Sequence, residues 1–377
     1  MTMLFATILI VCGKVNFTNL SRYSNLSEKT YRRQYEKRFN FAKFNAAVME
    51  AAIPDGHEKI AVMDCSFIPK NGKKTFGLDS SYNGTQGCVE QGLEVSLVGV
   101  VDVETETGYA LLAEQTFAQD YCPDLTRLDY YLLHLEGVRP LLPASVRYLT
   151  VDGYYAKAQF VSGAVEQNLE VISKLRCDAN LRYLFTGTQK PRGAKRKYDG
   201  KVDLATPTRL AWVQEVQPGI DLYTAIVWHV SFKRNIRLAY LRDGRTPNKL
   251  SYVVLFSTDL DQPAIDIYRF YKLRFQIEFI FRDAKQFTGL TDCQARDVKK
   301  LDFHFNASFS ALNLAKLDAQ QKHRGGEPFV FSMTSIKRRA LNDYLLETFI
   351  TKLELEPTAI KSHPNYQSLR NYGVIAA

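Results

Sequence analysis

Two acidic residues stand where an apolar strand normally excludes a charge. Asp64 interrupts the apolar run 60–68, and Asp152 directly follows the strand-like run 146–151. An ionised carboxylate inside a strand is costly unless a cation or hydrogen-bond donors compensate it. Acids near strand ends in open α/β sheets can also converge on one ligand. We therefore expect the two to meet at a metal ion; the alternatives are a hydrogen-bonded structural acid at Asp64 and an ordinary Asp-Gly turn at Asp152.

A third acid, Glu278, lies in a helical pattern over residues 263–287, which begins at a proline. At about 100° per residue, a stripe about 60° wide holds Glu278 together with Tyr271, Arg274 and Lys285. A carboxylate beside two bases and a phenol suits a phosphodiester site, where the acid holds a cation and the bases contact phosphates. The alternative is a set of intrahelical ion pairs, since Arg274 and Glu278 are four residues apart.

The surrounding patterns predict the elements that position these side chains. Strands are expected at 60–68, 93–103, 109–116, 146–151 and 169–175, and helices at 125–135 and 156–167. Residues 71–92 have the composition of a long Gly-rich loop. This order of elements resembles an RNase H-like fold that lacks its last helix. Further β-rich runs follow up to residue 257, so that a β-rich insertion is expected before the helix of 263–287.

The expected fold class is therefore α/β, an RNase H-like mixed sheet with flanking helices. We expect a catalytic core at 55–179 and 262–317, a β-rich insertion at 180–261 and a helical tail at 318–377. Residues 1–54 are expected to form a small helical, helix-turn-helix-like domain whose second helix, with Arg32 and Arg33, would read DNA. A solvated basic helix in any small bundle is the alternative there. Lys195, Arg196 and Lys197 belong to a basic loop that is either a phosphate contact or simply solvated.

Composition limits the class of protein. The chain has 377 residues, with 46% hydrophobic and 24% charged residues, which excludes disordered, collagen-like and coiled-coil proteins. Its net charge of +9 favours a polyanionic partner. Six scattered cysteines without a Cys-x-x-Cys pair argue against a zinc site or disulfides and fit the cytoplasm. The apolar stretch 3–12 is about half the length of a spanning helix, so no membrane partner is expected.

The spacing Tyr271-x2-Arg274-x3-Glu278-x6-Lys285 matches a known signature at all four positions. It resembles the Tyr-Arg-Glu-Lys signature of bacterial insertion-sequence DDE transposases of the insertion sequence 4 type. The resemblance covers about residues 56–317, including Asp64, Asp152 and the β-rich insertion. It implies that Asp64, Asp152 and Glu278 are catalytic and hold two Mg²⁺ ions, for which Mn²⁺ can substitute. Such a metal pair activates the attacking oxygen and stabilises the leaving one.

The resemblance also implies the substrate and the reaction. The substrates would be double-stranded DNA at the transposon inverted-repeat ends and at the target, bound by a homodimer in the bacterial cytoplasm at the nucleoid. Tyr271, Arg274 and Lys285 would contact DNA near the cleaved end, and the cut-and-paste pathway would pass through a hairpin intermediate. Two alternatives remain: a metal-dependent nuclease of the same fold without strand transfer, and a catalytically silent DNA-binding protein. The silent protein would be either a repressor that uses residues 15–35 or a domesticated remnant, and the presence of all three acids argues against the remnant.

Overall fold

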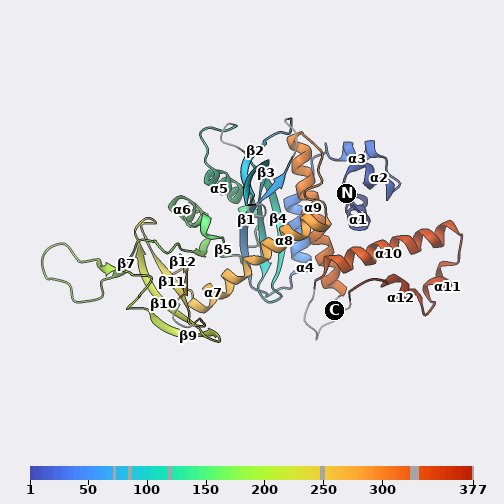
Figure 1. Cartoon of the computed structure of the whole chain (residues 1–377). Coiled ribbons are helices and arrows are strands. Elements are labelled where there is room, and N and C mark those ends of the chain that lie inside the picture. The colour runs from blue at the N-terminus through green and yellow to red at the C-terminus, as the bar shows by residue number, and fades with distance from the viewer. Residues whose placement is uncertain (71–73, 84–86, 118–120, 247–250, 323–330, 376–377) are drawn as a thin grey trace.

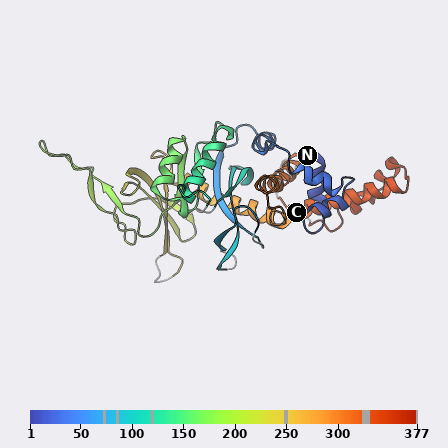
Figure 2. The same ribbon diagram turned by 90° about the horizontal axis from the view of Figure 1, so that it is seen from above.

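The computed structural model describes the chain except for residues 71–73, 84–86, 118–120, 247–250, 323–330 and 376–377 (Figure 1). It is a mixed α/β structure in which one large sheet carries helices on both faces. The sheet and helices occupy the centre of the molecule, strands β7–β12 lie on one side, and the N-terminal and C-terminal helices lie on the other (Figures 1 and 2).

Five strands form the central part of the sheet, in the order β4-β3-β1-β5-β6. Their bounds are β1 Lys59–Pro69, β3 Cys88–Asp102, β4 Thr107–Thr116, β5 Tyr148–Thr150 and β6 Glu170–Lys174. The pairs β1–β3 and β3–β4 are antiparallel, whereas β1–β5 and β5–β6 are parallel. The predicted hairpin of 93–103 and 109–116 is confirmed, and so are the three other strands of this part.

The expected loop at 71–92 is wrong in part, because β2 (Asp79–Asn83) and the first residues of β3 fall inside it. These two segments pair as an antiparallel ribbon, with Asp79 opposite Gly92 and Asn83 opposite Cys88. Residues 88–91 are exposed or half-buried, so no alternation of apolar and polar residues marks the strand in the sequence. β2 pairs with the first residues of β3, which extend beyond the part of β3 that pairs with β4.

Successive side chains of β1 point alternately to the two faces of the sheet, and each face is covered by its own set of helices. Ala61 and Met63 pack with α4 (Phe41–Ala52), α5 (Arg127–Val138) and α6 (Ala158–Glu166). Ile60 and Val62 pack on the opposite face with α7 (Ala264–Leu273), α8 (Phe275–Phe287) and α9 (Val298–Lys322). Since successive side chains of a strand point to opposite faces, Asp64 lies on the face of α7, α8 and α9.

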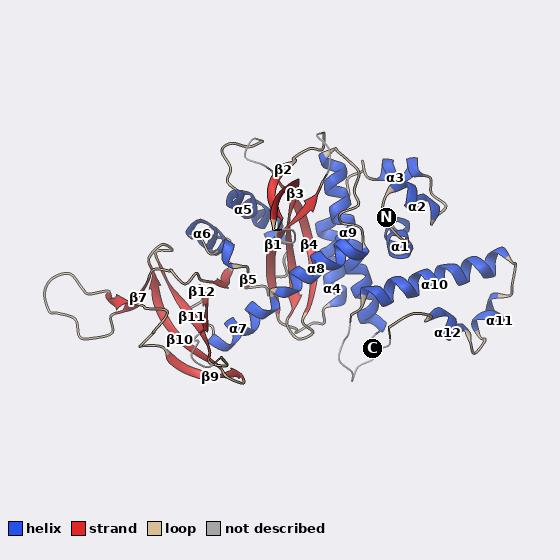
Figure 3. Cartoon of the chain, viewed as in Figure 1, coloured by secondary structure: helices blue, strands red, loops and turns tan. Residues whose placement is uncertain are grey.

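Strands β7–β12 continue the sheet beyond β6. Their bounds are β7 Leu181–Leu184, β8 Tyr198–Lys201, β9 Ala211–Gln217, β10 Ile220–His229, β11 Arg234–Asp243 and β12 Ser251–Ser257. β12 pairs antiparallel with β6, and the order from there is β11, β10, β7 and β8, while β9 pairs with β10. Figure 3 shows β9–β12 side by side. Four of these six strands fall on the predicted β-rich runs between residues 210 and 257.

The helix expected over 263–287 is two helices, because the helical hydrogen bonding breaks at Arg274. The Arg274 N–H donates to the carbonyl of Tyr271, three residues back, and the Ile277 N–H donates to the carbonyl of Arg274. These three-residue bonds tighten the chain locally and separate α7 from α8. One apolar face continues across the break, since Leu273, Ile277 and Ile280 are all buried against the sheet.

Helix α9 covers the free edge of β4 with side chains instead of a further strand. Asn306 receives the N–H of Ala113 and donates to its carbonyl, at 2.9 Å each. Asn313 does the same with Ala110, at 3.0 and 2.7 Å. The ammonium of Lys316 donates to the carbonyl of Gly108. Three buried side chains thus satisfy an edge that would otherwise pair with another chain.

The N-terminal helices form a small bundle on α9. They are α1 (Thr2–Ile10), α2 (Phe17–Arg22) and α3 (Glu28–Gln34), and their buried residues share a core with Phe303, Ala307 and Ala311 of α9. Ser27 caps α3 by accepting the N–H of Thr30. The C-terminal segment holds α10 (Met333–Lys352), α11 (Pro357–Lys361) and α12 (Tyr366–Arg370).

The Gly325-Gly326 pair, a break signal within the expected tail of 318–377, lies outside the described residues. Among the helices that the structure describes, none combines the length and the apolar character needed to cross a bilayer.

Candidate active site

Strands β1 and β5 bring Asp64 and Asp152 to the same level of the sheet. Ala61 pairs with Leu149 and Val62 with Thr150 in parallel register. Just beyond these pairs, Asp152 lies close enough to Asp64 for its charge to raise the pKa of the Asp64 carboxyl. Asp152 also makes the expected turn: its carboxylate accepts the N–H of Tyr154 at 2.8 Å. The strand order, rather than the local sequence, therefore makes the two acids neighbours.

Helix α8 places Glu278 opposite the two strand acids, through Arg274. The Arg274 guanidinium is buried and its Nη1 lies 2.9 Å from Glu278 Oε1 and 3.7 Å from Asp64 Oδ2. The ion pair between Arg274 and Glu278 that the sequence allows is therefore present. Arg274 also pairs with Asp64 on β1. Arg274 Nε is buried and has no hydrogen-bond partner in the part of the chain that the structure describes.

The carboxyl group of Asp64 is in an unfavourable place for a negative charge. Its side chain is 21% exposed, and burial, together with repulsion by Asp152 and Glu278, raises its pKa to about 7. The N–H of Cys65, which donates to Asp64 at 2.8 Å, and the charge of Arg274 oppose this rise without cancelling it. A cation held among the three acids would remove the repulsion, which makes this donor set suitable for a metal.

The three acids are near one another, but they are more widely spaced than a single tight ligand set. Their oxygens do not all lie within 4.8 Å of one another. Carboxylate oxygens are the ligands that hard divalent cations prefer, so Asp64, Asp152 and Glu278 could hold a metal, but not as one tight set of three ligand atoms.

Tyr271 and Lys285 lie on the same side of the sheet as these acids. The Arg274 guanidinium sits 5.6 Å from the centre of the Tyr271 ring, and burial raises the pKa of Tyr271. Lys285 Nζ donates to the carbonyl of Phe67 at 3.0 Å, which ties the last turn of α8 to β1 three residues beyond Asp64. Burial lowers the pKa of Lys285.

The other predicted DNA contacts lie away from the acids. Lys195, Arg196 and Lys197 are exposed in the connection between β7 and β8, at the far side of the molecule in Figure 1. Arg196 pairs with Asp199 and covers the Phe185 ring at 4.8 Å. Arg32 and Arg33 are exposed on α3, at the opposite side, and Arg32 pairs with Glu28. Neither basic group therefore contributes to the geometry around Asp64.

Two residues beside Asp152 could not be singled out from the sequence. Tyr154 is 44% exposed, and the ammonium of Lys157 lies 4.0 Å from the centre of its ring. The run Asp152-Gly-Tyr-Tyr contained the signal, an aromatic residue two positions after the acid. The partner of Tyr154 is Lys157, which follows the short turn of Gly153–Tyr155.

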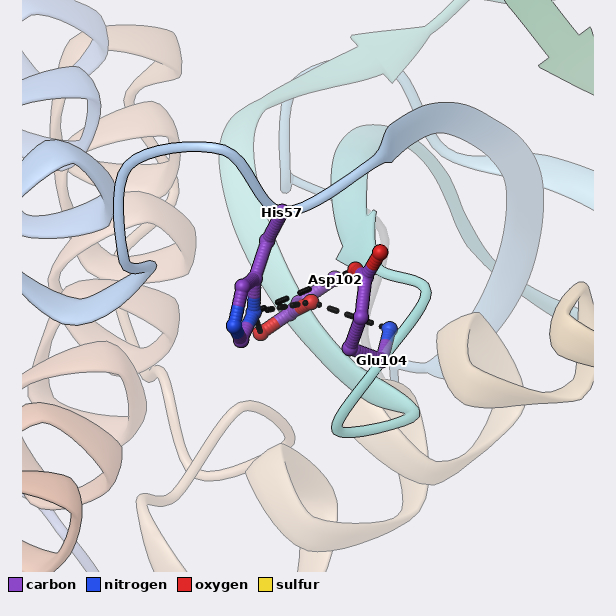
Figure 4. Close-up of side chains that lie close together, drawn as sticks. All are labelled: His57, Asp102 and Glu104. Atoms are coloured by element: carbon purple, nitrogen blue, oxygen red, sulfur yellow. Dashed lines mark hydrogen bonds and ion pairs between the residues drawn. The ribbon is translucent and has the colours of Figure 1, made fainter.

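A separate group of possible metal ligands lies at the other end of β1. The ligand atoms of His57, Asp102 and Glu104 lie within 4.8 Å of one another, and this is the one such group among the described residues (Figure 4). Its hydrogen bonds explain it without an ion: Asp102 accepts His57 Nδ1 at 3.0 Å and also the N–H of Glu104 and the hydroxyl of Thr105. The group fastens the chain before β1 to the β3–β4 turn.

The sequence matches one family model, described as the transposase DDE domain, over residues 60–314. No curated protein matches the chain. The matched segment covers about two thirds of the chain and includes the three acids, Arg274 and every strand of the sheet. Transposases of this kind bind DNA and act on it as enzymes. By the match and by the sheet that brings its acids together, the chain belongs to the family of transposases with a DDE domain.

Proposed function

We propose that the protein is a cut-and-paste transposase of the insertion sequence 4 type, with Asp64, Asp152 and Glu278 as its catalytic and metal-binding residues. The supporting observation is the meeting of two strand acids with one helix acid around a carboxyl group whose pKa is raised to about 7. The Tyr-Arg-Glu-Lys spacing on α7 and α8 supports the finer assignment to this type.

In this proposal the central part of the sheet is an RNase H-like core. The order β4-β3-β1-β5-β6, with the first three strands antiparallel and the last three parallel, supports it. Residues 180–261 are the β-rich insertion, which extends the core sheet through β12. Residues 1–54 would bind the transposon ends, with Arg32 and Arg33 on α3, and residues 318–377 would form the tail of a homodimer that works in the bacterial cytoplasm.

Two divalent cations, Mg²⁺ or Mn²⁺, would supply Lewis-acid stabilisation of the attacking and leaving oxygens. Asp64, Asp152 and Glu278 would hold them, while Arg274 fixes the Glu278 carboxylate through its 2.9 Å bond. The unpaired Arg274 Nε supports a further role: a buried donor without a partner costs about 1–3 kcal/mol, which a DNA phosphate oxygen would recover. Tyr271 and Lys285 would contact the same strand, and a hairpin intermediate remains part of the proposal.

The test is a cleavage and joining assay on DNA that carries the inverted repeats flanking the reading frame. With Mg²⁺, the wild-type protein should release the flanked segment and join precleaved 3′-hydroxyl ends to a target plasmid. Asp64→Asn, Asp152→Asn and Glu278→Gln should each abolish both reactions and retain DNA binding. Cleavage without joined product would favour a nuclease of the same fold, and unchanged cleavage by Asp64→Asn would remove that residue from the site.

A further inference from the structure

A cleft of about 500 Å³ lies where three distant segments of the chain meet. Its walls are the α1–α2 connection (residues 10–15), the end of α8 with the turn after it (285–292), and the first turns of α10 (334–341). We call it the junction cleft. It joins the N-terminal bundle to the catalytic sheet, and none of its three segments is close to another in the sequence.

The junction cleft is lined by four cations and one carboxylate. The cations are Lys14, Lys285, Lys337 and Arg338, and the carboxylate is Asp292, which already accepts the N–H of Val15 at 2.8 Å. Within the described part of the chain, none of the four has a carboxylate oxygen within 4.0 Å. A concave surface with one sign of unpaired charge concentrates an anionic ligand.

Lys337 offsets the partial negative charge of two helix carboxyl ends at this surface. Its half-buried ammonium donates to the carbonyls of Ile8 and Phe287, near the carboxyl ends of α1 and α8. Helix carboxyl ends carry partial negative charge, which would repel an anion. Burial lowers the pKa of Lys337 to about 8, so the group remains mostly charged at neutral pH and would gain from a nearby anion. Lys14 and Arg338 are exposed at the rim and free to contact it.

The junction cleft begins about 10 Å from the candidate active site. Lys285 is seven residues after Glu278 on α8, or about 10.5 Å at 1.5 Å per residue. It also bonds to Phe67, three residues after Asp64 on β1, or about 10 Å at 3.3 Å per residue. The separations along α8 and along β1 therefore agree at about 10 Å. This separation equals roughly three base-pair steps of 3.4 Å along one strand.

We propose that the junction cleft binds the phosphate backbone of the transposon-end duplex about three base pairs from the cleaved bond, between the active site and the N-terminal bundle. Lys14 and Arg338 contact the phosphates directly, and Lys337 and Lys285 hold the cleft in shape and charge. The inference rests on the proposed function, because it takes DNA as the substrate of the acids. It adds a positioning site that fixes how far the duplex advances into the active site.

The experiment compares Lys14→Ala/Arg338→Ala with the wild type in binding a duplex oligonucleotide that carries one terminal repeat. Both side chains are exposed and make no hydrogen bond or ion pair in the described structure, so the variant should fold normally. The matched control, Lys322→Ala/Lys361→Ala, removes two lysines that pair with Asp318 and Glu347 outside the cleft. Binding is measured at several salt concentrations between about 50 and 200 mM.

The cleft variant should lose about two units from the slope of log K against log salt, and its affinity near 0.1 M salt should fall roughly 10- to 60-fold. The control should match the wild type. A duplex with a neutral methylphosphonate about three positions from the cleaved end should weaken wild-type binding and leave the variant unaffected. Equal losses in variant and control, or a wild-type slope in the variant, would overturn the proposal.

Cleavage by the wild type and by Asp64→Asn is measured on the same duplex to separate the two hypotheses. Asp64-dependent cleavage with a wild-type slope in the cleft variant would refute the cleft and keep the proposed function. A reduced slope without metal-dependent cleavage would support the cleft as a DNA phosphate site and refute the transposase reaction. A wild-type protein that does not bind the duplex would overturn both.

Discussion

Asp64→Asn should make the metal-free protein more stable at pH 8, at the same time as it abolishes cleavage. Burial and the neighbouring carboxylates raise the pKa of Asp64 from 3.8 to about 7. Between these two pH values the folded protein keeps a proton on Asp64 that the unfolded chain has released. Stability from this group is therefore greatest below pH 3.8 and decreases as the pH rises to about 7. Asparagine has no charge to lose and can still accept the N–H of Cys65.

The magnitude follows from the two pKa values. The difference between 3.8 and about 7 corresponds to about 4 kcal/mol at 1.36 kcal/mol per pH unit, as an upper limit. The Asp64 side chain is only 21% exposed, so solvent screening reduces this modestly. With an unfolding entropy of about 2.1 cal/mol/K per residue over 377 residues, 4 kcal/mol corresponds to about 5 °C in Tm.

Calorimetry in EDTA between pH 4 and pH 8 measures the effect. The Tm difference between Asp64→Asn and the wild type should be near zero at pH 4 and approach about 5 °C at pH 8. Added Mg²⁺ should raise the Tm of the wild type and leave the variant unchanged. Asp178→Asn is the control, because its bond to Arg176 lowers the pKa of Asp178 and its loss should not stabilise the protein. A variant no more stable than the wild type at pH 8 would refute the reasoning.

Three further outcomes are expected. Arg274→Ala should reduce cleavage about 100-fold, because it frees Glu278 and removes the charge beside Asp64; single-turnover cleavage at saturating DNA measures this, and an unchanged rate would contradict the assignment. Glu278→Gln should lose cleavage at every Mg²⁺ concentration while duplex affinity stays within about twofold in a binding titration. Asn313→Ala should destabilise the protein by about 2–4 kcal/mol in urea, because the N–H and carbonyl of Ala110 lose their buried partner; a change below 1 kcal/mol would show that the edge of β4 finds other partners.

The candidate acids could be predicted from the sequence because each breaks a local pattern. Asp64 is a charge inside a buried strand, and Glu278 sits at the border of the apolar face of a helix. The strands and most helices could also be predicted, because the spacing of their apolar residues is itself a local pattern. The pairing of β1 with β5 could be anticipated only through the order of elements, since the two strands are separated by about 80 residues.

Other features depend on distant contacts that no local pattern records. The sequence alone predicts a continuous helix over 263–287, whereas the structure divides it at Arg274, whose side chain pairs with Asp64 on β1. Asn306 and Asn313 looked like ordinary polar residues of α9, and their role appears only with β4 beside them. Lys14 and Arg338 are unremarkable surface cations until folding brings their segments together at the junction cleft.

The side-chain cover of β4 has a consequence for synthesis of the protein on the ribosome. The N–H of Ala113 has its hydrogen-bond acceptor in Asn306, which is synthesised 193 residues later. At about 5–20 residues per second, the nascent hairpin presents an open edge for about 10–40 s before α9 exists. Translation that stops early would leave that edge permanently available to other chains, so truncated products should aggregate through residues 107–116 and depend on chaperones, unlike the finished enzyme.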